Sequence, residues 1–127
     1  MTAEEKKMFE KAEEIQEGKR LWLDGDCFYD SETGKVDLFC EGCNDEWGYF
    51  DKGVGAIWLP RQDQLQEMVE TTETLPELIV QDKLAHFCMW VKYQCHIPLT
   101  SMEQLWLAFV MKEKYNKTWD GEEWLIQ

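Results

Sequence analysis

The first segment of the chain has apolar residues at a helical spacing. Between Thr2 and Gly18 they recur three or four positions apart, so they share one side of a helix. Thr2 with Glu5 forms a capping box at the start, and Gly18 is a common helix end. The apolar stripe is thin and consists of Met8, Ala12 and Ile15. We therefore expect an N-terminal helix, within residues 1–18, that packs lightly or forms a peripheral arm.

Residues 21–58 change to short strand-like runs that are separated by turn residues. The runs Cys27–Tyr29 and Val36–Phe39 flank a polar turn that contains a glycine, which is the pattern of a β-hairpin. Two further short strands are predicted at Trp47–Phe50 and Ala56–Trp58. We expect these runs to form a small antiparallel sheet of three or four strands.

Residues 60–127 return to a helical spacing and begin with a short helix. A long helix is predicted over Thr74–Cys95, opened by a capping box of Thr74 and the glutamate three residues later. Because this helix is apolar on two sides, it should be central to its domain. Ser101 with Gln104 opens the last helix, and the short connection predicts antiparallel packing of the two. Trp119–Leu125 is predicted as an edge strand of the sheet.

The predicted fold class is α+β: a small antiparallel acidic β-hairpin sheet packed with a C-terminal helical core, plus an N-terminal helix. A chain of 127 residues is the size of one domain. We therefore predict a single domain over residues 1–127, with an acidic β region at 21–58 and a helical core with a Trp-rich tail at 60–127. A hydrophobic content of 44%, with seven tryptophans, excludes a disordered acidic tail.

Negative charge is concentrated in the segment 21–51. It holds nine carboxylates and one base, Lys35, and so supplies −8 of the net charge of −13. Direct binding to nucleic acid or to anionic lipid depends on cationic side chains, so we exclude both and expect a basic protein partner. The residues predicted to bind this partner are Asp24, Asp26, Asp30, Glu32, Asp37, Glu41, Asp45, Glu46 and Asp51. The alternative is that these carboxylates only make a solvated face soluble.

The five cysteines are interpreted from the expected compartment. No stretch approaches the ~20 apolar residues of a membrane span, and the N-terminus has no apolar signal region, so a cytoplasmic protein is predicted. A reducing cytosol and an odd number of cysteines favour thiols or metal ligands over structural disulfides. Those cysteines are Cys27, Cys40, Cys43, Cys88 and Cys95.

A zinc site is the main metal hypothesis. Cys40 and Cys43 have the C-x-x-C spacing that brings two thiolates onto one tetrahedral metal. Cys27, on the facing hairpin strand, would supply a third ligand, and the long helix a fourth. The alternative is that the pair is coincidental and Cys27 is an ordinary strand residue. No other cofactor is expected.

Two other kinds of site are weighed against these. Cys95 adjoins His96 and Cys88 lies near His86, but a catalytic thiol needs a base that faces it, and consecutive helical residues do not face one another. Catalysis through these residues is therefore not expected. The first three aspartates of the acidic segment suggest a calcium loop, but they lack its D-x-D-x-D-G order. A pair of carboxylates for two Mg²⁺ would lack basic surface to hold a polyanionic substrate.

The C-terminal half of the chain carries a resemblance. The segments Ile57–Gln66, Ser101–Met111 and Trp119–Trp124 resemble a group of small proteins carried by phages and prophages of Gram-positive bacteria. The group has no assigned activity and no catalytic motif, so the resemblance implies an accessory phage product that acts in the cytoplasm of the bacterial host. By analogy, small acidic phage proteins of the anti-CRISPR or anti-restriction type bind host nucleic-acid enzymes.

Two functions of different classes follow from these observations. In the first, the acidic segment binds a basic protein surface, and its spaced carboxylates imitate the phosphates of a nucleic acid and inhibit a host nucleic-acid-binding enzyme. In the second, the chain is a small zinc-stabilised domain with a structural or regulatory role.

Overall fold

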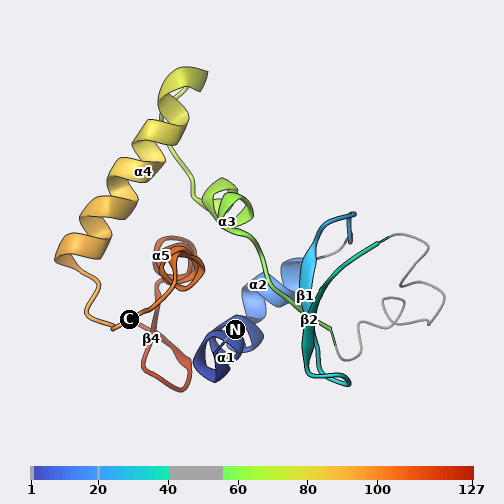
Figure 1. Ribbon diagram of the computed structural model, residues 1–127. Helices are drawn as coiled ribbons and strands as arrows, with labels where there is room; N and C mark the ends of the chain where they lie inside the picture. The colour runs from blue at the N-terminus through green and yellow to red at the C-terminus, as the bar shows by residue number, and fades with distance from the viewer. Residues whose placement is uncertain (1, 20, 41–55) are drawn as a thin grey trace. The chain divides into compact units, whose positions relative to one another are not determined.

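The structure, a computed structural model, describes residues 2–19, 21–40 and 56–127. In these ranges it contains five helices and five strands, and the strands form one three-stranded and one two-stranded antiparallel sheet (Figure 1). The α+β fold class and the N-terminal helical segment are therefore confirmed. The chain divides into two compact units, Met1–Arg61 and Gln62–Gln127, and each is described by itself.

The N-terminal segment of the first unit is two helices and not one. Helix α1 spans Ala3–Lys11 and helix α2 spans Glu13–Gly18. The Thr2 half of the predicted capping box is confirmed, because the Glu5 amide donates to Thr2 Oγ1 at 3.1 Å. The break falls at Ala12, whose ψ of 74° leaves the helical region.

The prediction that this segment packs lightly is wrong. Met8, Phe9, Ala12 and Ile15 are all buried. Phe9 adjoins Met8 and was not part of the predicted stripe, and the change of direction at Ala12 gives the two short helices separate buried faces. Together these side chains make the helices part of the core of their unit.

The acidic hairpin forms as predicted. Strand β1 covers Cys27–Asp30, β2 covers Lys35–Leu38 and β3 covers Ala56–Trp58, in the order β2-β1-β3. Gly34 in the connecting turn has a φ of +74°, a left-handed conformation that glycine adopts without steric cost. The strand predicted at Trp47–Phe50 lies outside the described residues.

Gln16 joins the helices to the sheet. Its Nε2 donates to the Trp58 carbonyl oxygen at 2.8 Å, and its Oε1 accepts from the Trp58 amide at 2.9 Å. The same Nε2 donates to the Phe9 carbonyl oxygen at 3.0 Å. One side-chain amide therefore pairs with both backbone groups of a β3 residue and fixes α2 to that strand.

In the second unit, helix α5 lies at the centre. It spans Met102–Tyr115 and begins at the predicted capping box of Ser101 and Gln104, which is confirmed. All of its residues from Trp106 to Met111 are buried. Helix α3, Gln62–Met68, packs on it and buries Leu65.

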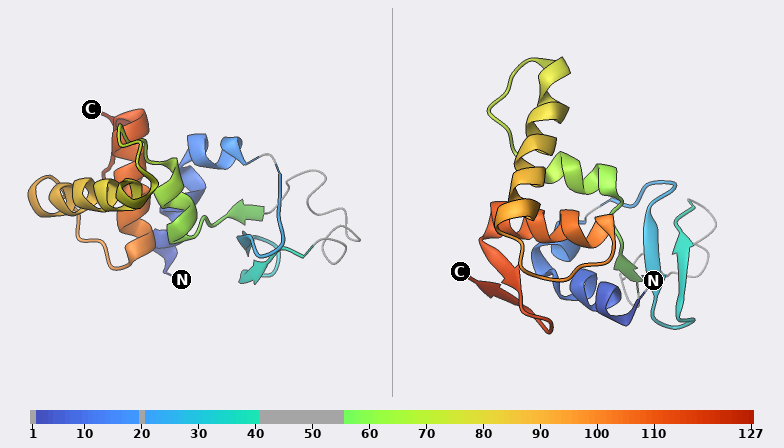
Figure 2. Two further views of the ribbon diagram at one scale, coloured as in Figure 1. Left: turned by 90° about the horizontal axis from the view of Figure 1, so that it is seen from above. Right: turned by 60° about the vertical axis from the view of Figure 1, so that its left-hand side comes forward.

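Helix α4, Pro76–Tyr93, differs from its prediction at its start and in its position. Its N-cap is Leu75, without a side-chain bond, so the capping box predicted at Thr74 is wrong. Glu73 instead accepts the Thr74 and Leu75 amides. Helix α4 is also not central, because among its described residues those buried are Phe87 and Trp90. It crosses α5 steeply and does not run antiparallel to it (Figures 1 and 2).

The C-terminal segment forms a sheet of its own. Strands β4, Lys117–Trp119, and β5, Trp124–Ile126, pair antiparallel with each other, with Trp119 opposite Trp124. The two indole rings lie 5.1 Å apart between centroids. The prediction that this segment adds an edge strand to the acidic sheet is therefore wrong, because the pairing of its own two tryptophans closes it locally.

Candidate functional site

The acidic hairpin holds five of the nine predicted partner-binding residues within the described part of the chain. These are Asp24, Asp26, Asp30, Glu32 and Asp37. Glu41, Asp45, Glu46 and Asp51 lie outside the described residues.

Three of the five carboxylates are exposed. Asp24 lies in the turn before β1, Glu32 in the turn after it, and Asp37 on β2 opposite Phe28. Asp24 and Glu32 are therefore separated by the length of β1, which is roughly 13 Å at ~3.3 Å per residue. Charges spread along an extended element suit contact with an extended cationic surface better than chelation of one ion.

Asp26 does not belong to this exposed surface, which corrects its prediction as a partner-binding residue. Its exposure is 1%. Its Oδ2 lies 2.6 Å from Lys19 Nζ and accepts the Leu23 amide at 2.8 Å. Lys19 Nζ also lies 4.4 Å from the centroid of the Trp58 ring, a cation–π geometry. Asp26 is thus the internal partner of the half-buried Lys19, and it holds the turn that precedes β1.

Asp30 shapes the hairpin turn. Its Oδ1 accepts the amides of Glu32 at 2.8 Å and Thr33 at 3.4 Å, and its carbonyl oxygen accepts the Gly34 amide at 2.8 Å. This is an Asx-type turn, in which the carboxylate replaces a backbone acceptor. In the strand register Asp30 is also opposite Lys35, so part of its charge is offset.

The two faces of strand β2 differ in chemistry. Side chains alternate along a strand, and directly opposed residues share a face. Lys35 and Asp37 therefore lie on one face of β2, and Val36 and Leu38 lie on the other. Both apolar side chains are exposed. The hairpin presents carboxylates together with accessible apolar area.

Cys27, the first predicted zinc ligand, is half-buried on β1 as a free thiol. Burial raises the pKa of this thiol; the nearby Arg61 guanidinium acts in the opposite direction, and Asp37 adds to the rise. Arg61 is held beside it, since its guanidinium donates to the Gly25 carbonyl oxygen at 2.9 Å. Without a metal, Cys27 is therefore a neutral thiol near pH 7, and metal binding would have to remove its proton.

Cys40 is disulfide-bonded, which contradicts the expectation that all five cysteines are reduced. A disulfide sulfur is not a thiolate ligand, so zinc binding at this position requires reduction first. Cys43 lies outside the described residues. Within the part of the chain that the structure describes, no group of three or more His, Cys, Asp or Glu side chains is arranged to hold a metal ion.

The thiol and imidazole groups of the second unit have separate surroundings. Cys95 Sγ lies 3.7 Å from the Ile97 carbonyl oxygen, to which it donates. His86 Nδ1 lies 3.8 Å from Asp82 Oδ2. Cys88 is exposed on α4. None of these contacts joins a cysteine to a histidine.

Sequence reasoning missed the residues that position the hairpin. Gln16 lies inside the predicted N-terminal helix and Lys19 just after it, and the sequence assigns neither a role, yet they make the contacts that fix the sheet. The one available signal is that Lys19 lies two residues before the densely acidic segment 21–51, whose carboxylates are possible partners for a cation inside the fold.

Taken together, these residues define an acidic β-hairpin on an α+β scaffold. No protein-family model, curated protein or solved structure matches the chain. Among the described residues, none of the helices combines the length and apolar character needed to cross a membrane.

Proposed function

We propose that this protein binds a basic surface of another protein through its acidic hairpin. The observation that carries the proposal is the charge of the segment 21–51, which supplies −8 of the net −13. Exposure of Asp24, Glu32 and Asp37 on the hairpin supports it. Opposite charge on a partner would raise the association rate and fix the orientation of the complex.

The proposed partner is a nucleic-acid-binding enzyme of a bacterial host. Such an enzyme carries lysine and arginine along a channel that normally neutralises phosphates. Carboxylates spaced along an extended hairpin can occupy that channel and exclude the nucleic acid. The protein would then act as a phage-type inhibitor in the cytoplasm of the host, of the anti-CRISPR or anti-restriction kind.

The described contacts give the hairpin residues different roles in this proposal. Asp24, Glu32 and Asp37 make the contact, because their side chains are accessible. Asp26 and Asp30 hold the shape of the hairpin through Lys19 and the turn amides. Loss of the first group should remove binding with the fold intact, whereas loss of the second should first affect the fold.

The test is capture of partners from a lysate of a Gram-positive bacterium by the tagged full chain. Bound proteins are identified by mass spectrometry after washing at low and at high salt. We expect one nucleic-acid-handling enzyme, released by high salt or by competing duplex DNA, because both disrupt charge-dependent contacts. Capture that neither treatment reverses would contradict a charge-based mechanism.

Two matched variants distinguish the effect of the hairpin carboxylates from the effect of the total negative charge of the chain. Asp24→Asn with Glu32→Gln and Asp37→Asn removes three exposed carboxylates from the hairpin. Glu17→Gln with Glu113→Gln and Glu123→Gln removes three exposed carboxylates elsewhere. We expect the first variant to lose the enzyme and the second to retain it. Equal behaviour of the two would show that the hairpin has no special part in binding.

A further inference from the structure

Helix α4 exposes apolar side chains that a helix of this composition normally buries. Val80 is 66% exposed, Leu84 48% and Tyr93 63%. A helix that is apolar around most of its circumference is usually enclosed by other elements. Of the described residues of α4, Phe87 and Trp90 are those that α5 and its neighbours bury.

The exposed residues include one continuous stripe. Val80, Leu84, Cys88 and Val91 are spaced by four, four and three residues, and such residues are neighbours on a helix surface. Val80, Leu84 and Cys88 are exposed, and Val91 is half-buried. The stripe adjoins Phe87, so it runs along the border of the covered part of the helix. Met89 and Tyr93 are also exposed on α4, but the stripe is the exposed apolar surface that adjoins the buried face.

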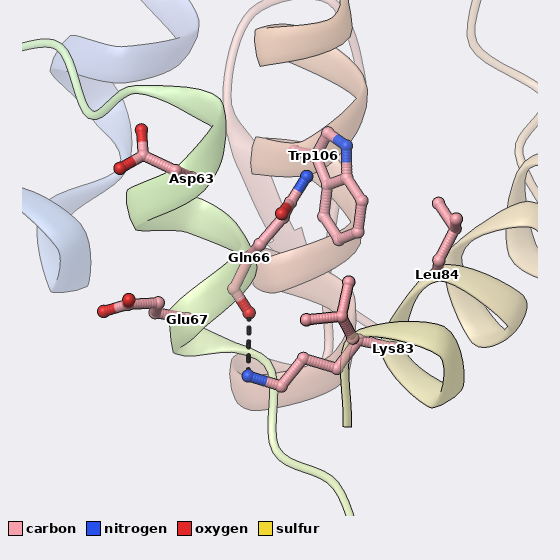
Figure 3. Close-up of a pocket in the computed structure, with 7 residues that line it drawn as sticks. Asp63, Gln66, Glu67, Lys83, Leu84 and Trp106 are labelled. Carbon is pink, nitrogen blue, oxygen red and sulfur yellow. Dashed lines mark hydrogen bonds between the residues drawn. The ribbon is translucent and has the colours of Figure 1, made fainter. Parts of the chain in front are cut away.

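A pocket of about 230 Å³ lies beside the first half of the stripe. Val80 and Leu84 line one side, α3 lines another, and the buried Trp106 also contributes. Figure 3 shows Lys83 bridging α4 and α3, with its Nζ donating to the Gln66 carbonyl oxygen at 3.2 Å. Trp106 Nε1 has no hydrogen-bond partner within the described residues. The stripe is thus continuous with a recess that can accept an apolar side chain.

We propose that a second copy of this chain covers the stripe, with the two α4 helices packed antiparallel about a two-fold axis. In such an isologous contact the same surface serves both subunits. The stripe then meets itself, and an apolar side chain from each copy can enter the recess of the other. The proposal is independent of the acidic hairpin and of its partner.

The charges of α4 balance, so they do not oppose contact between two copies of this helix. The whole chain has a net charge of −13, but α4 carries two acids, Glu77 and Asp82, and two bases, Lys83 and Lys92. Two such surfaces do not repel each other through net charge. Asp63 and Glu67 of α3 also line the recess beside the stripe, so the case for a second copy depends on the arrangement of individual charges along α4 and not on the net charge of the surface.

The positions of two of these charges set the direction of packing. Glu77 precedes Leu84 by seven residues and lies on the side of the stripe, and Lys92 follows Cys88 by four and flanks it. Lys92 Nζ lies 5.2 Å from the centroid of the Tyr93 ring, so it would leave that ring to reach a partner subunit. Antiparallel packing centred next to Leu84 places Glu77 beside Lys92 of the partner subunit, twice in each dimer. Parallel packing would place each charge beside its own kind.

The first test is the molecular mass of the full chain by sedimentation over a range of concentrations, with a reductant present to exclude crosslinking through Cys88. We expect a reversible dimer. Leu84→Glu should raise the dissociation constant at least about tenfold, because it places two carboxylates at the centre of the contact. Leu21→Glu, at an exposed leucine of the first unit, is the matched control and should leave the dimer intact.

The second test exchanges the charges of positions 77 and 92. Misfolding of a variant would not give the pattern of loss and restoration that this exchange predicts. Glu77→Lys and Lys92→Glu should each weaken the dimer, and the two together should restore it, because they recreate the opposite pairs. Circular dichroism confirms that each variant is folded. A wild-type chain that stays monomeric, a dimer that survives Leu84→Glu, or a double variant that is not restored would each overturn the proposal. A persistent monomer would assign the stripe to a different protein or to another part of this chain.

Discussion

The unit Met1–Arg61 and the unit Gln62–Gln127 join their elements by different interactions. In the first, polar groups do this inside the fold: Lys19 pairs with Asp26 at 2.6 Å, and Gln16 bonds both backbone groups of Trp58. In the second, aromatic rings do it. Phe87 on α4 stacks on Trp106 of α5, with 3.8 Å between ring centroids and 7° between ring planes.

Because their elements are joined differently, the two units should respond differently to amino-acid substitutions. A buried polar pair depends on both partners, since either one alone is left charged or unbonded in a dry site. Stacked rings depend on volume and shape, and they respond little to salt or pH. The first unit should therefore be sensitive to the loss of single polar atoms, and the second to the loss of side-chain volume.

The largest expected effect is on the aromatic cluster of the second unit. Trp106 is 1% exposed and also lies 5.9 Å from the ring of Phe109. Trp106→Ala should lower the free energy of unfolding by up to about 5 kcal/mol, because it removes a large buried side chain and leaves a cavity. Urea unfolding at low and high salt measures this loss, which should not depend on salt. A loss of stability that depends on salt would contradict the conclusion that aromatic packing, and not charge, joins the elements of the second unit.

The next effect concerns the buried ion pair of the first unit. Asp26→Asn should lower the free energy of unfolding by about 3 kcal/mol, because it leaves the largely covered Lys19 ammonium without its counter-charge. Asp24→Asn, two positions away and exposed, is the control and should change stability by no more than about 0.5 kcal/mol. Similar losses in the two variants would show that Lys19 does not depend on Asp26.

A smaller effect separates the disulfide from the zinc hypothesis. In oxidised protein, Cys40→Ser should lower the free energy of unfolding by about 2 kcal/mol, because the unfolded chain loses a crosslink. In reduced protein with added zinc, the same substitution should have no effect. If Cys40 instead holds zinc, the result is reversed: the loss appears in the reduced, zinc-containing sample, and wild-type protein carries one equivalent of the metal.

The smallest effect is a dependence on alkaline pH. Because burial raises the pKa of Cys27 in the folded protein, the unfolded chain loses this proton first. The stabilising contribution is complete below the unfolded pKa of about 8.5 and is lost as pH rises through the folded value. Unfolding of wild type and Cys27→Ser should therefore differ less at pH 10 than at pH 7. A difference that stays constant would contradict the raised pKa.

Elements formed by neighbouring residues could be predicted from the sequence. The cap at Thr2, the capping box of Ser101 and Gln104, and the hairpin turn at Gly34 each depend on groups within a few positions. Thr74 has the same local signal as Ser101, yet the helix begins later. There Pro76 occupies the first turn and Glu73 accepts the nearby amides.

The site was only partly predictable, because burial depends on contacts between distant residues. Asp24 and Asp26 are equivalent as sequence signals, and the approach of Lys19 makes one internal and leaves the other exposed. The prediction that α4 is central was wrong for a related reason. Its two apolar sides predict enclosure, but the elements of its own unit cover only the part that holds Phe87 and Trp90.

The contacts of Gln16 and Lys19 decide how the acidic hairpin can be transplanted. A synthetic peptide or graft that starts at residue 21 would omit the ammonium that holds Asp26 and the amide that holds β3. Asp26 would then lose the ammonium beside it, and the turn before β1 would be held only by contacts within the graft, such as the Leu23 amide with Asp26 Oδ2. The smallest segment that carries its own framework therefore begins at Gln16, and α2 has to accompany the hairpin into any host scaffold.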